Sequence, residues 1–124
     1  LEAIDIIINE KMIENVRHLE PIFMGGLKNF EDLEFIGESR GIGLMGALEM
    51  VQDKKNKLPF DGSISIGERV ANKCIENGLI CRPLGPSIVL CPPFITSEEE
   101  MGIIFDTLEK TLKEVFSEVK SLGQ

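Results

Sequence analysis

The chain has 124 residues, of which 43% are hydrophobic and 27% are charged. Thirteen Lys and Arg residues against 21 Asp and Glu residues give a formal net charge of −8, which disfavours binding to a nucleic acid or to an anionic membrane. No apolar run comes near the roughly 20 residues of a membrane-spanning helix. We therefore expect one globular domain at most, in the cytoplasm.

The first third of the chain has helical spacing. Leu1–Ile8 has the pattern of the middle of an amphipathic helix rather than of a natural N-terminus, so we expect a piece of a longer protein. From Met12 to Phe30 the apolar residues recur at steps of three or four, which predicts a helix. Pro21 and the pair Gly25–Gly26 interrupt this pattern and predict a kink or a split near Pro21.

The middle of the chain changes character. Residues 33–51 predict a strand, a glycine-rich bend and a second, longer strand. The polar stretch 52–62 has the composition of an exposed loop. Ser65 and Glu68 have the spacing of a capping box, and the apolar face that follows predicts a short helix that ends at Gly78.

The last part predicts two strands and a long helix. The apolar runs Leu79–Cys81 and Ile88–Cys91 predict a hairpin-like pair of strands joined by a wide turn. Thr96 and Ser97 each precede a glutamate by three residues, which is again capping-box spacing. The expected buried face of the final helix is Met101, Ile104, Phe105, Leu108, Leu112, Val115, Phe116 and Val119. Together the elements predict an α+β fold, a small antiparallel sheet flanked by helices.

The run Gly41–Gly46 matches GxGxxG, in which glycines let the backbone approach a pyrophosphate at a helix N-terminus. No buried parallel strand precedes it here, and a strand-like segment rather than a helix follows. We therefore expect a strand that bends where another backbone comes close.

Metal ligands and acid/base residues are not evident. Cys74, Cys81 and Cys91 lack zinc-ligand spacing and His18 is the single histidine, so we expect no metal site and three buried, reduced thiols. His18 lies one residue off the apolar helix face and is expected at the surface or its boundary. Glu98–Glu100 suit the positive end of a helix dipole better than acid/base catalysis. We identify no catalytic residue.

Arg82 is the candidate binding residue. It follows an apolar run and precedes Pro83, which favours extended backbone at Arg82. A guanidinium held in this way can bind a carboxylate through two parallel hydrogen bonds. The alternative is a structural arginine paired with one of the 21 acidic residues of the chain, and the residues alone leave both open. Arg40 has the same two interpretations, of which the structural one is favoured.

Three segments together resemble the C-terminal part of class III pyridoxal-phosphate-dependent aminotransferases, most of all the omega-amino acid and amine:pyruvate transaminases. They are Gly78–Gly85 with Ser87–Thr96, Glu38–Glu49, and Pro59–Gly62 with the helix after it. The resemblance covers essentially the whole chain. It implies that residues 1–124 are the C-terminal small domain of a fold-type I enzyme with its leading helix. It also implies a homodimeric parent that uses pyridoxal 5'-phosphate, with an amine and a keto acid such as pyruvate as substrates.

The resemblance also assigns roles to residues. In the amine:pyruvate branch, an arginine at the position of Arg82 binds the carboxylate of pyruvate or alanine and swings out to admit a hydrophobic amine substituent. The Schiff-base lysine and the acid that pairs with the pyridine nitrogen belong to the family's large domain. Neither motif occurs here, and Lys54, Lys55 and Lys57 lie in the polar loop. The chain alone is therefore expected to be inactive and to lack cofactor-binding residues.

Two alternatives from other functional classes remain. The chain could be a free-standing module that binds a carboxylate metabolite, in which case it binds pyruvate or β-alanine by itself. It could instead be a dimerisation or folding unit, whose self-association is indifferent to small acids.

Overall fold

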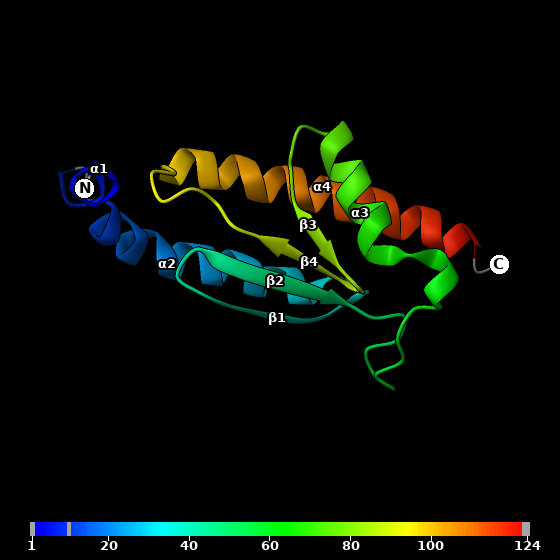
Figure 1. Cartoon of the computed structure of the whole chain (residues 1–124). Coiled ribbons are helices and arrows are strands. Elements are labelled where there is room, and N and C mark those ends of the chain that lie inside the picture. Colours follow the sequence, from blue (N-terminus) through cyan, green and yellow to red (C-terminus); the bar gives the residue numbers. More distant parts are fainter. Residues whose placement is uncertain (1, 10, 123–124) are drawn as a thin grey trace.

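A computed structural model describes residues 2–9 and 11–122 (Figure 1). The α+β class is confirmed. The elements in chain order are α1 (Glu2–Asn9), α2 (Met12–Asn29), the 3₁₀ turn η1 (Phe30–Asp32), β1 (Ile36–Ile42), β2 (Met45–Met50), the 3₁₀ turn η2 (Gly62–Ile64), α3 (Ile66–Glu76), β3 (Arg82–Leu84), β4 (Ser87–Leu90) and α4 (Glu98–Leu122). None of the described helices combines the length and the hydropathy that a membrane span requires.

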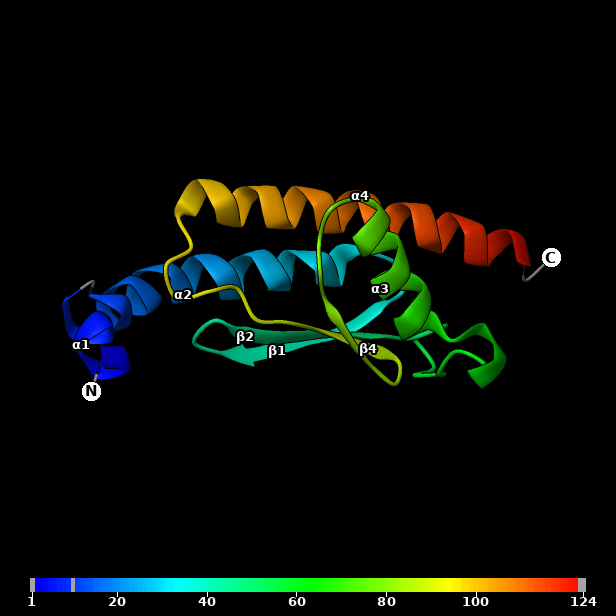
Figure 2. The same ribbon diagram turned by 45° about the horizontal axis from the view of Figure 1, so that its top comes forward.

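The four strands form one antiparallel sheet in the order β1-β2-β4-β3. Figure 2 shows α2 and α4 side by side over one face of this sheet, with α3 packed at the end that carries β3 and β4. No described α-helix covers the opposite face. The sheet therefore has one face turned to the core and one face free of helices.

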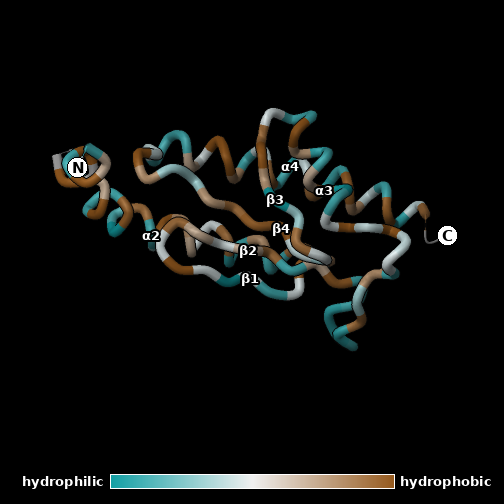
Figure 3. Tube along the Cα trace, in the orientation of Figure 1, coloured by the Kyte–Doolittle hydropathy of each residue, from teal (hydrophilic) through white to brown (hydrophobic). Residues whose placement is uncertain are grey.

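The core lies between the sheet and the two long helices. In Figure 3 most of β4 is hydrophobic, while α2 and α4 alternate between hydrophobic and hydrophilic residues. The core-facing side of the sheet is made by Ile36, Leu48, Met50, Ile88 and Leu90. The helices contribute Leu19, Phe23 and Leu27 from α2 and Met101, Leu108, Leu112, Val115, Phe116 and Val119 from α4. Ile104 and Phe105 of the expected α4 face are half-buried, and Thr111 joins the buried set.

The helix α2 is continuous through Pro21, so the expected split is wrong. Proline removes one backbone donor from a helix. Here Leu19 before the proline and Phe23 and Leu27 after it are all buried on one side. Packing of both halves against the same core offsets the missing hydrogen bond.

The glycines of the GxGxxG run serve a close approach, as expected. Gly41 and Gly46 lie directly opposite each other in the β1–β2 hairpin. A Cβ added to Gly41 would lie 2.4 Å from the carbonyl oxygen of Met45, and one added to Gly46 would lie 2.3 Å from Cδ1 of Leu27. The second strand is not the longer one, because the first strand continues through its glycines and has 7 residues against 6.

The expected capping box at the start of α3 is wrong. Ser65 has a left-handed backbone (φ 51°) and its hydroxyl donates to the carbonyl of Gly62 at 3.4 Å rather than capping α3. The reason is the 3₁₀ turn directly before α3, which Ser65 also terminates. Asp61 caps that turn by accepting from the Ser63 N–H at 2.8 Å. At the other end Leu79 N–H donates to Cys74 O at 2.7 Å, and the helix stops before Gly78 as predicted.

The strand before the second hairpin begins three residues later than predicted. Arg82–Leu84, not Leu79–Cys81, pairs with β4, and the turn through Gly85 and Pro86 is tight rather than wide. β3 is an edge strand of the sheet. Pro83 is tolerated there because a proline, which has no backbone N–H, cannot donate a hydrogen bond to a strand on that side.

The start of α4 is capped as predicted by one of the two candidate residues. Ser97 N–H donates to Glu100 Oε1 at 3.0 Å, and Glu100 N–H donates to Ser97 Oγ at 3.1 Å. Thr96 is buried, and its hydroxyl donates to Pro93 O instead.

Candidate functional site

Arg40 and Arg82 lie in one cross-strand row of the sheet. Arg40 is opposite Ala47, Ala47 is opposite Val89, and Val89 is opposite Arg82. Directly opposed residues of antiparallel strands share a face, so both arginines belong to the same face at its two edges. Three strand spacings of about 4.8 Å separate their backbones by roughly 14 Å.

This face is the one free of helices. The neighbouring row contains Leu48 and Ile88, which are both fully buried against the helices on the other side. Nothing in the local sequence indicates that Arg40 and Arg82 share a face, because that depends on the register of strands that are distant in the chain.

Arg40 is a structural arginine, as favoured. Its Nη1 atom lies 3.1 Å from Glu38 Oε2 and 3.3 Å from Glu49 Oε2. Both carboxylates come from the same two strands, so the three side chains form a surface cluster on the β1–β2 hairpin. One guanidinium nitrogen, Nη1, is thus paired with two of this chain's own acids.

Arg82 differs from Arg40 in its surroundings. It is the first residue of β3, and its side chain is exposed. No acidic residue within residues 2–9 and 11–122 lies at ion-pair distance from it. The backbone is extended, as Pro83 predicts, and β4 holds it through the pairing with Val89. The arrangement leaves an available guanidinium on a defined strand, which is what two-point binding of a carboxylate needs.

The residue before Arg82 anchors this strand to the core. Cys81 is buried next to Cys74, which is fully buried in α3. A hydrogen bond with Cys74, together with burial, raises the pKa of the Cys81 thiol, and the same bond lowers the pKa of Cys74. Cys91 is exposed, so the expectation of three buried thiols is wrong for this residue. β4 ends at Leu90, and Cys91 leaves the sheet.

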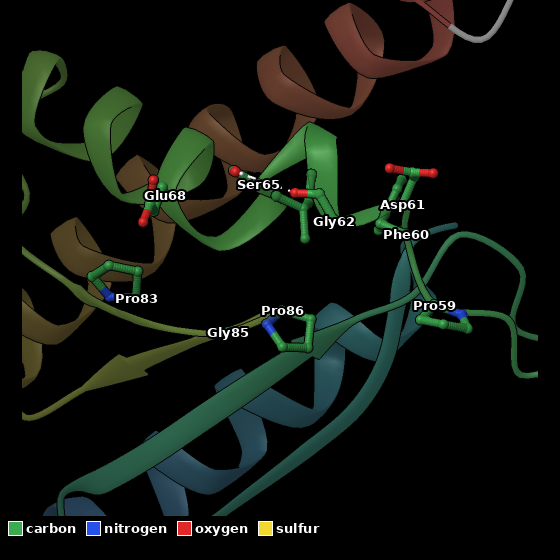
Figure 4. A pocket seen from close by; sticks show the side chains of 10 residues that line it. Pro59, Phe60, Asp61, Gly62, Ser65, Glu68, Pro83, Gly85 and Pro86 are labelled. Atoms are coloured by element: carbon green, nitrogen blue, oxygen red, sulfur yellow. Dashed lines mark hydrogen bonds between the residues drawn. The ribbon is translucent and has the colours of Figure 1, made fainter.

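A cavity of about 400 Å³ lies between the start of α3 and the β3–β4 turn (Figure 4). Asp61 and Glu68 contribute its acidic side chains, and hydrogen bonds from Ser63 lower the pKa of Asp61. Arg82 does not line it. Its remaining walls are Pro59, Phe60, Gly62, Ser65, Ile66, Pro83, Gly85 and Pro86. Because the charged residues of this wall are acidic, the cavity does not suit a phosphate group.

A larger groove of about 970 Å³ runs between α2, the β1–β2 turn and the segment after β4. Its exposed apolar side chains include Ile13, Ile42, Met45 and Phe94. Exposed apolar residues gathered on one surface indicate an interaction site.

The other residues considered from the sequence have structural surroundings. His18 is exposed as expected, with Nε2 2.5 Å from Glu98 Oε1 at the start of α4. Lys55 and Lys57 are exposed in the polar loop, whereas Lys54 is half-buried and its ammonium donates to the backbone carbonyl of Glu31. Among the residues that the structure describes, no three His, Cys, Asp or Glu side chains form a group able to hold a metal ion.

Comparison with known proteins identifies the family. Residues 1–112 match the family model for class-III aminotransferases. The adenosylmethionine-8-amino-7-oxononanoate aminotransferase of Methanocaldococcus jannaschii is 36% identical over 114 residues, which cover 92% of this chain and 25% of that protein.

Solved structures agree with the family model. The omega-transferase from Vibrio fluvialis JS17 is 56% identical with a TM-score of 0.95, over 98% of this chain and 29% of its own. A PMP-bound aminotransferase from Vibrio fluvialis is 57% identical with a TM-score of 0.93, over 96% of this chain and 26% of its own. A transaminase with L-alanine is 28% identical with a TM-score of 0.91, over 96% of this chain and 28% of its own. The chain thus spans about a quarter of the length of the proteins it matches. It belongs to the class III aminotransferase family.

Proposed function

We propose that residues 1–124 are the C-terminal small domain of a pyridoxal-phosphate-dependent transaminase that moves an amino group between an amine or omega-amino acid and pyruvate. In this proposal Arg82 binds the carboxylate of the acid substrate. The observation that carries the proposal is the difference between Arg40 and Arg82, which lie in one cross-strand row of the sheet. Arg40 has two carboxylates of its own, while Arg82 has none among the described residues.

The substrate class follows from the chemistry of Arg82. A guanidinium gives two parallel hydrogen bonds to a carboxylate, a geometry that a lysine ammonium cannot reproduce. Its exposed side chain starts from an edge strand, which leaves it room to move aside for a substrate that has no carboxylate. The similarity to an omega-transferase and to a transaminase with L-alanine supports an acceptor of the pyruvate type.

The cofactor belongs to the remainder of the enzyme in this proposal. Similar structures include PMP-bound and PLP-bound aminotransferases, and the cofactor supplies the carbon–nitrogen chemistry of amino transfer. A Schiff-base lysine needs a lowered pKa. Every described lysine here is exposed, or bound to a carboxylate or a carbonyl, and Glu76 raises the pKa of Lys73. The described residues therefore do not fit the lysine role, and we expect the chain alone to be inactive.

The apolar groove supports the assignment as one domain of a larger enzyme. Its exposed Ile13, Ile42, Met45 and Phe94 are expected to be covered by the rest of the polypeptide, since relatives are about four times longer. A homodimeric parent and a cytoplasmic location remain predictions from the sequence.

The test is an assay of the full-length gene product. With an amine donor and pyruvate, we expect alanine to form only when pyridoxal phosphate is present. Absence of alanine formation with a range of amines and omega-amino acids would contradict the proposed reaction.

The isolated chain tests the alternatives. Calorimetric titration of residues 1–124 with pyruvate and β-alanine should show no binding, because the rest of the site is missing. Binding would favour a free-standing carboxylate module. Self-association in sedimentation that is unaffected by either acid, with no activity of the full-length product, would favour a dimerisation unit.

A further inference from the structure

We propose that Gly67 is a positioning residue for substrate-carboxylate binding, because it allows α3 to fix the turn of the hairpin that carries Arg82. The inference deepens the proposed function and rests on the role given there to Arg82. Gly67 has no signal in the sequence beyond being a glycine in the first turn of an otherwise regular helix, where glycine is unfavourable.

The contact at Gly67 is with backbone, not with a flexible side chain. A Cβ added to Gly67 would lie 2.2 Å from the carbonyl oxygen of Gly85 and 3.2 Å from that of Ser87. The first distance is more than 1 Å below the roughly 3.5 Å of an ordinary van der Waals contact. Gly67 itself is buried. A side chain of any kind at this position must push α3 and the β3–β4 turn apart.

The turn is also defined from within the sheet. Gly85 has a left-handed backbone (φ 57°), and a Cβ added to it would meet nothing within 4 Å. Pro86 O accepts a hydrogen bond from Met50 N–H at 3.0 Å, which joins the turn to the end of β2. The turn is thus fixed on one side by β2 and on the other by the surface of α3 at Gly67.

Movement of the turn reaches Arg82 through β3. This strand has 3 residues and pairs only with β4, so its position depends on the hairpin and on the buried Cys81 directly before it. Gly85 follows Arg82 by three residues, which is about 10 Å of extended chain. Since no acidic side chain among the described residues holds the guanidinium, the strand alone sets where it starts. A misplacement of 1 Å at a binding group can cost on the order of 100-fold in rate.

The experiment compares Gly67→Ala with a matched control in the full-length enzyme. Gly102→Ala is the control, because Gly102 also lies in the first turns of a helix but has nothing within 4 Å of an added Cβ. For each variant, the second-order rate constant of the half-reaction without keto acid is measured with a carboxylate donor, β-alanine, and with a carboxylate-free donor, benzylamine. We expect Gly67→Ala to lose about 10- to 100-fold for β-alanine and much less for benzylamine. Gly102→Ala should match the wild type for both donors.

A second pair of variants covers the case in which Gly67→Ala does not fold. Gly85→Ala strains the turn without a steric clash, whereas Gly85→Asn is tolerated because asparagine accepts a left-handed backbone. We expect the alanine variant to show the selective loss of β-alanine activity and the asparagine variant to restore most of it. In Gly67→Ala and in Gly85→Ala, faster hydrogen exchange at the Met50 amide should accompany the loss of β-alanine activity.

The outcomes separate the inference from the function on which it rests. Equal losses for both donors, or an unchanged Met50 amide, in Gly67→Ala and Gly85→Ala would overturn the positioning role. If Arg82→Ala itself affects both donors equally, the proposed role of Arg82 fails, and hydrogen exchange still reports whether Gly67 fixes the turn.

Discussion

Arg40 and Arg82 lie in one row of the sheet, yet only Arg40 is bound to carboxylates within the described part of the chain. A substrate carboxylate that approached Arg40 would meet repulsion from Glu38 and Glu49. At Arg82 no described acid competes. Arg82 precedes Pro83, which restricts its backbone, whereas Arg40 precedes Gly41, which does not. The register of the strands and the neighbouring acids then separate the roles of the two arginines.

The close contact at Gly46 predicts a large loss of stability on substitution. In Gly46→Ala the new methyl group would lie 2.3 Å from Leu27 Cδ1 and 2.9 Å from Phe23 Cε2, inside the core between β2 and α2. Overpacking of this kind costs about 1–3 kcal/mol. Urea denaturation of the chain should show that loss. Gly25→Ala, in an exposed turn of α2 with nothing within 4 Å, should be neutral or stabilise by up to about 1 kcal/mol. Similar effects of the two substitutions would contradict the packing described.

Several features of the fold that depend on a few neighbouring residues were predicted correctly. The apolar spacing of α2 and α4, the Ser97 capping box and the end of α3 before Gly78 depend on residues within one or two turns, and all were predicted. The errors arise where a neighbouring element or the position of a strand in the sheet decides the outcome. Ser65 lost its capping role to a preceding 3₁₀ turn, and β3 began at Arg82 because the sheet edge accepts Pro83.

Glu31 predicts a pH-dependent contribution to stability. Hydrogen bonds from the Ser39 hydroxyl and N–H, at 2.8 and 3.0 Å, lower the pKa of Glu31 below its usual value of 4.5 and link η1 to β1. Because the folded pKa is lowered, the stabilisation is complete above pH 4.5 and is lost as the pH falls through the folded pKa. Glu31→Gln should therefore lower the thermal unfolding midpoint at pH 7. The difference in midpoint between the variant and the wild type should disappear once the pH falls below the folded pKa of Glu31.

Asp32→Asn is the charge-matched control for Glu31→Gln. Asp32 is the exposed neighbour of Glu31, and the substitution removes the same formal charge. It should leave the unfolding midpoint nearly unchanged across the same pH range. A difference for Glu31→Gln that is constant with pH would contradict the account.

The cysteines predict a pattern of chemical modification. Cys91 is exposed, whereas Cys74 and Cys81 are buried, and a hydrogen bond with Cys74 raises the pKa of Cys81. The thiolate is the reactive form, so modification of the native chain by iodoacetamide should be fast at Cys91 alone. Mass spectrometry after partial labelling measures which cysteines are modified. A urea-denatured sample is the control, in which all three cysteines should react. Fast labelling of Cys81 in the native chain would be inconsistent with its burial.

The candidate site could be predicted in part. Arg82 was identified from its position beside Pro83 and from the family resemblance, because both signals lie in adjacent residues. The contact between Gly67 and Gly85 joins residues 18 positions apart, and the shared face of the arginines depends on three strand pairings. Relations of this kind are set by tertiary packing, and no local pattern indicates them.

The most direct test of the central claim is substitution of the two arginines in the full-length enzyme. We expect the bound substrate and the rest of the enzyme to bury Arg82, which is exposed in the described chain. Arg82→Ala should then reduce kcat/KM for the carboxylate donor β-alanine by an amount equivalent to about 2–5 kcal/mol, the usual effect of removing one partner of a buried charge pair. Arg82→Ala should change kcat/KM for benzylamine far less. Arg40→Ala should change kcat/KM for neither donor by more than an amount equivalent to about 1 kcal/mol, the upper end for an exposed ion pair. Equal losses for both donors in Arg82→Ala, or a larger carboxylate-specific loss in Arg40→Ala, would contradict the assignment of Arg82 as the carboxylate-binding residue.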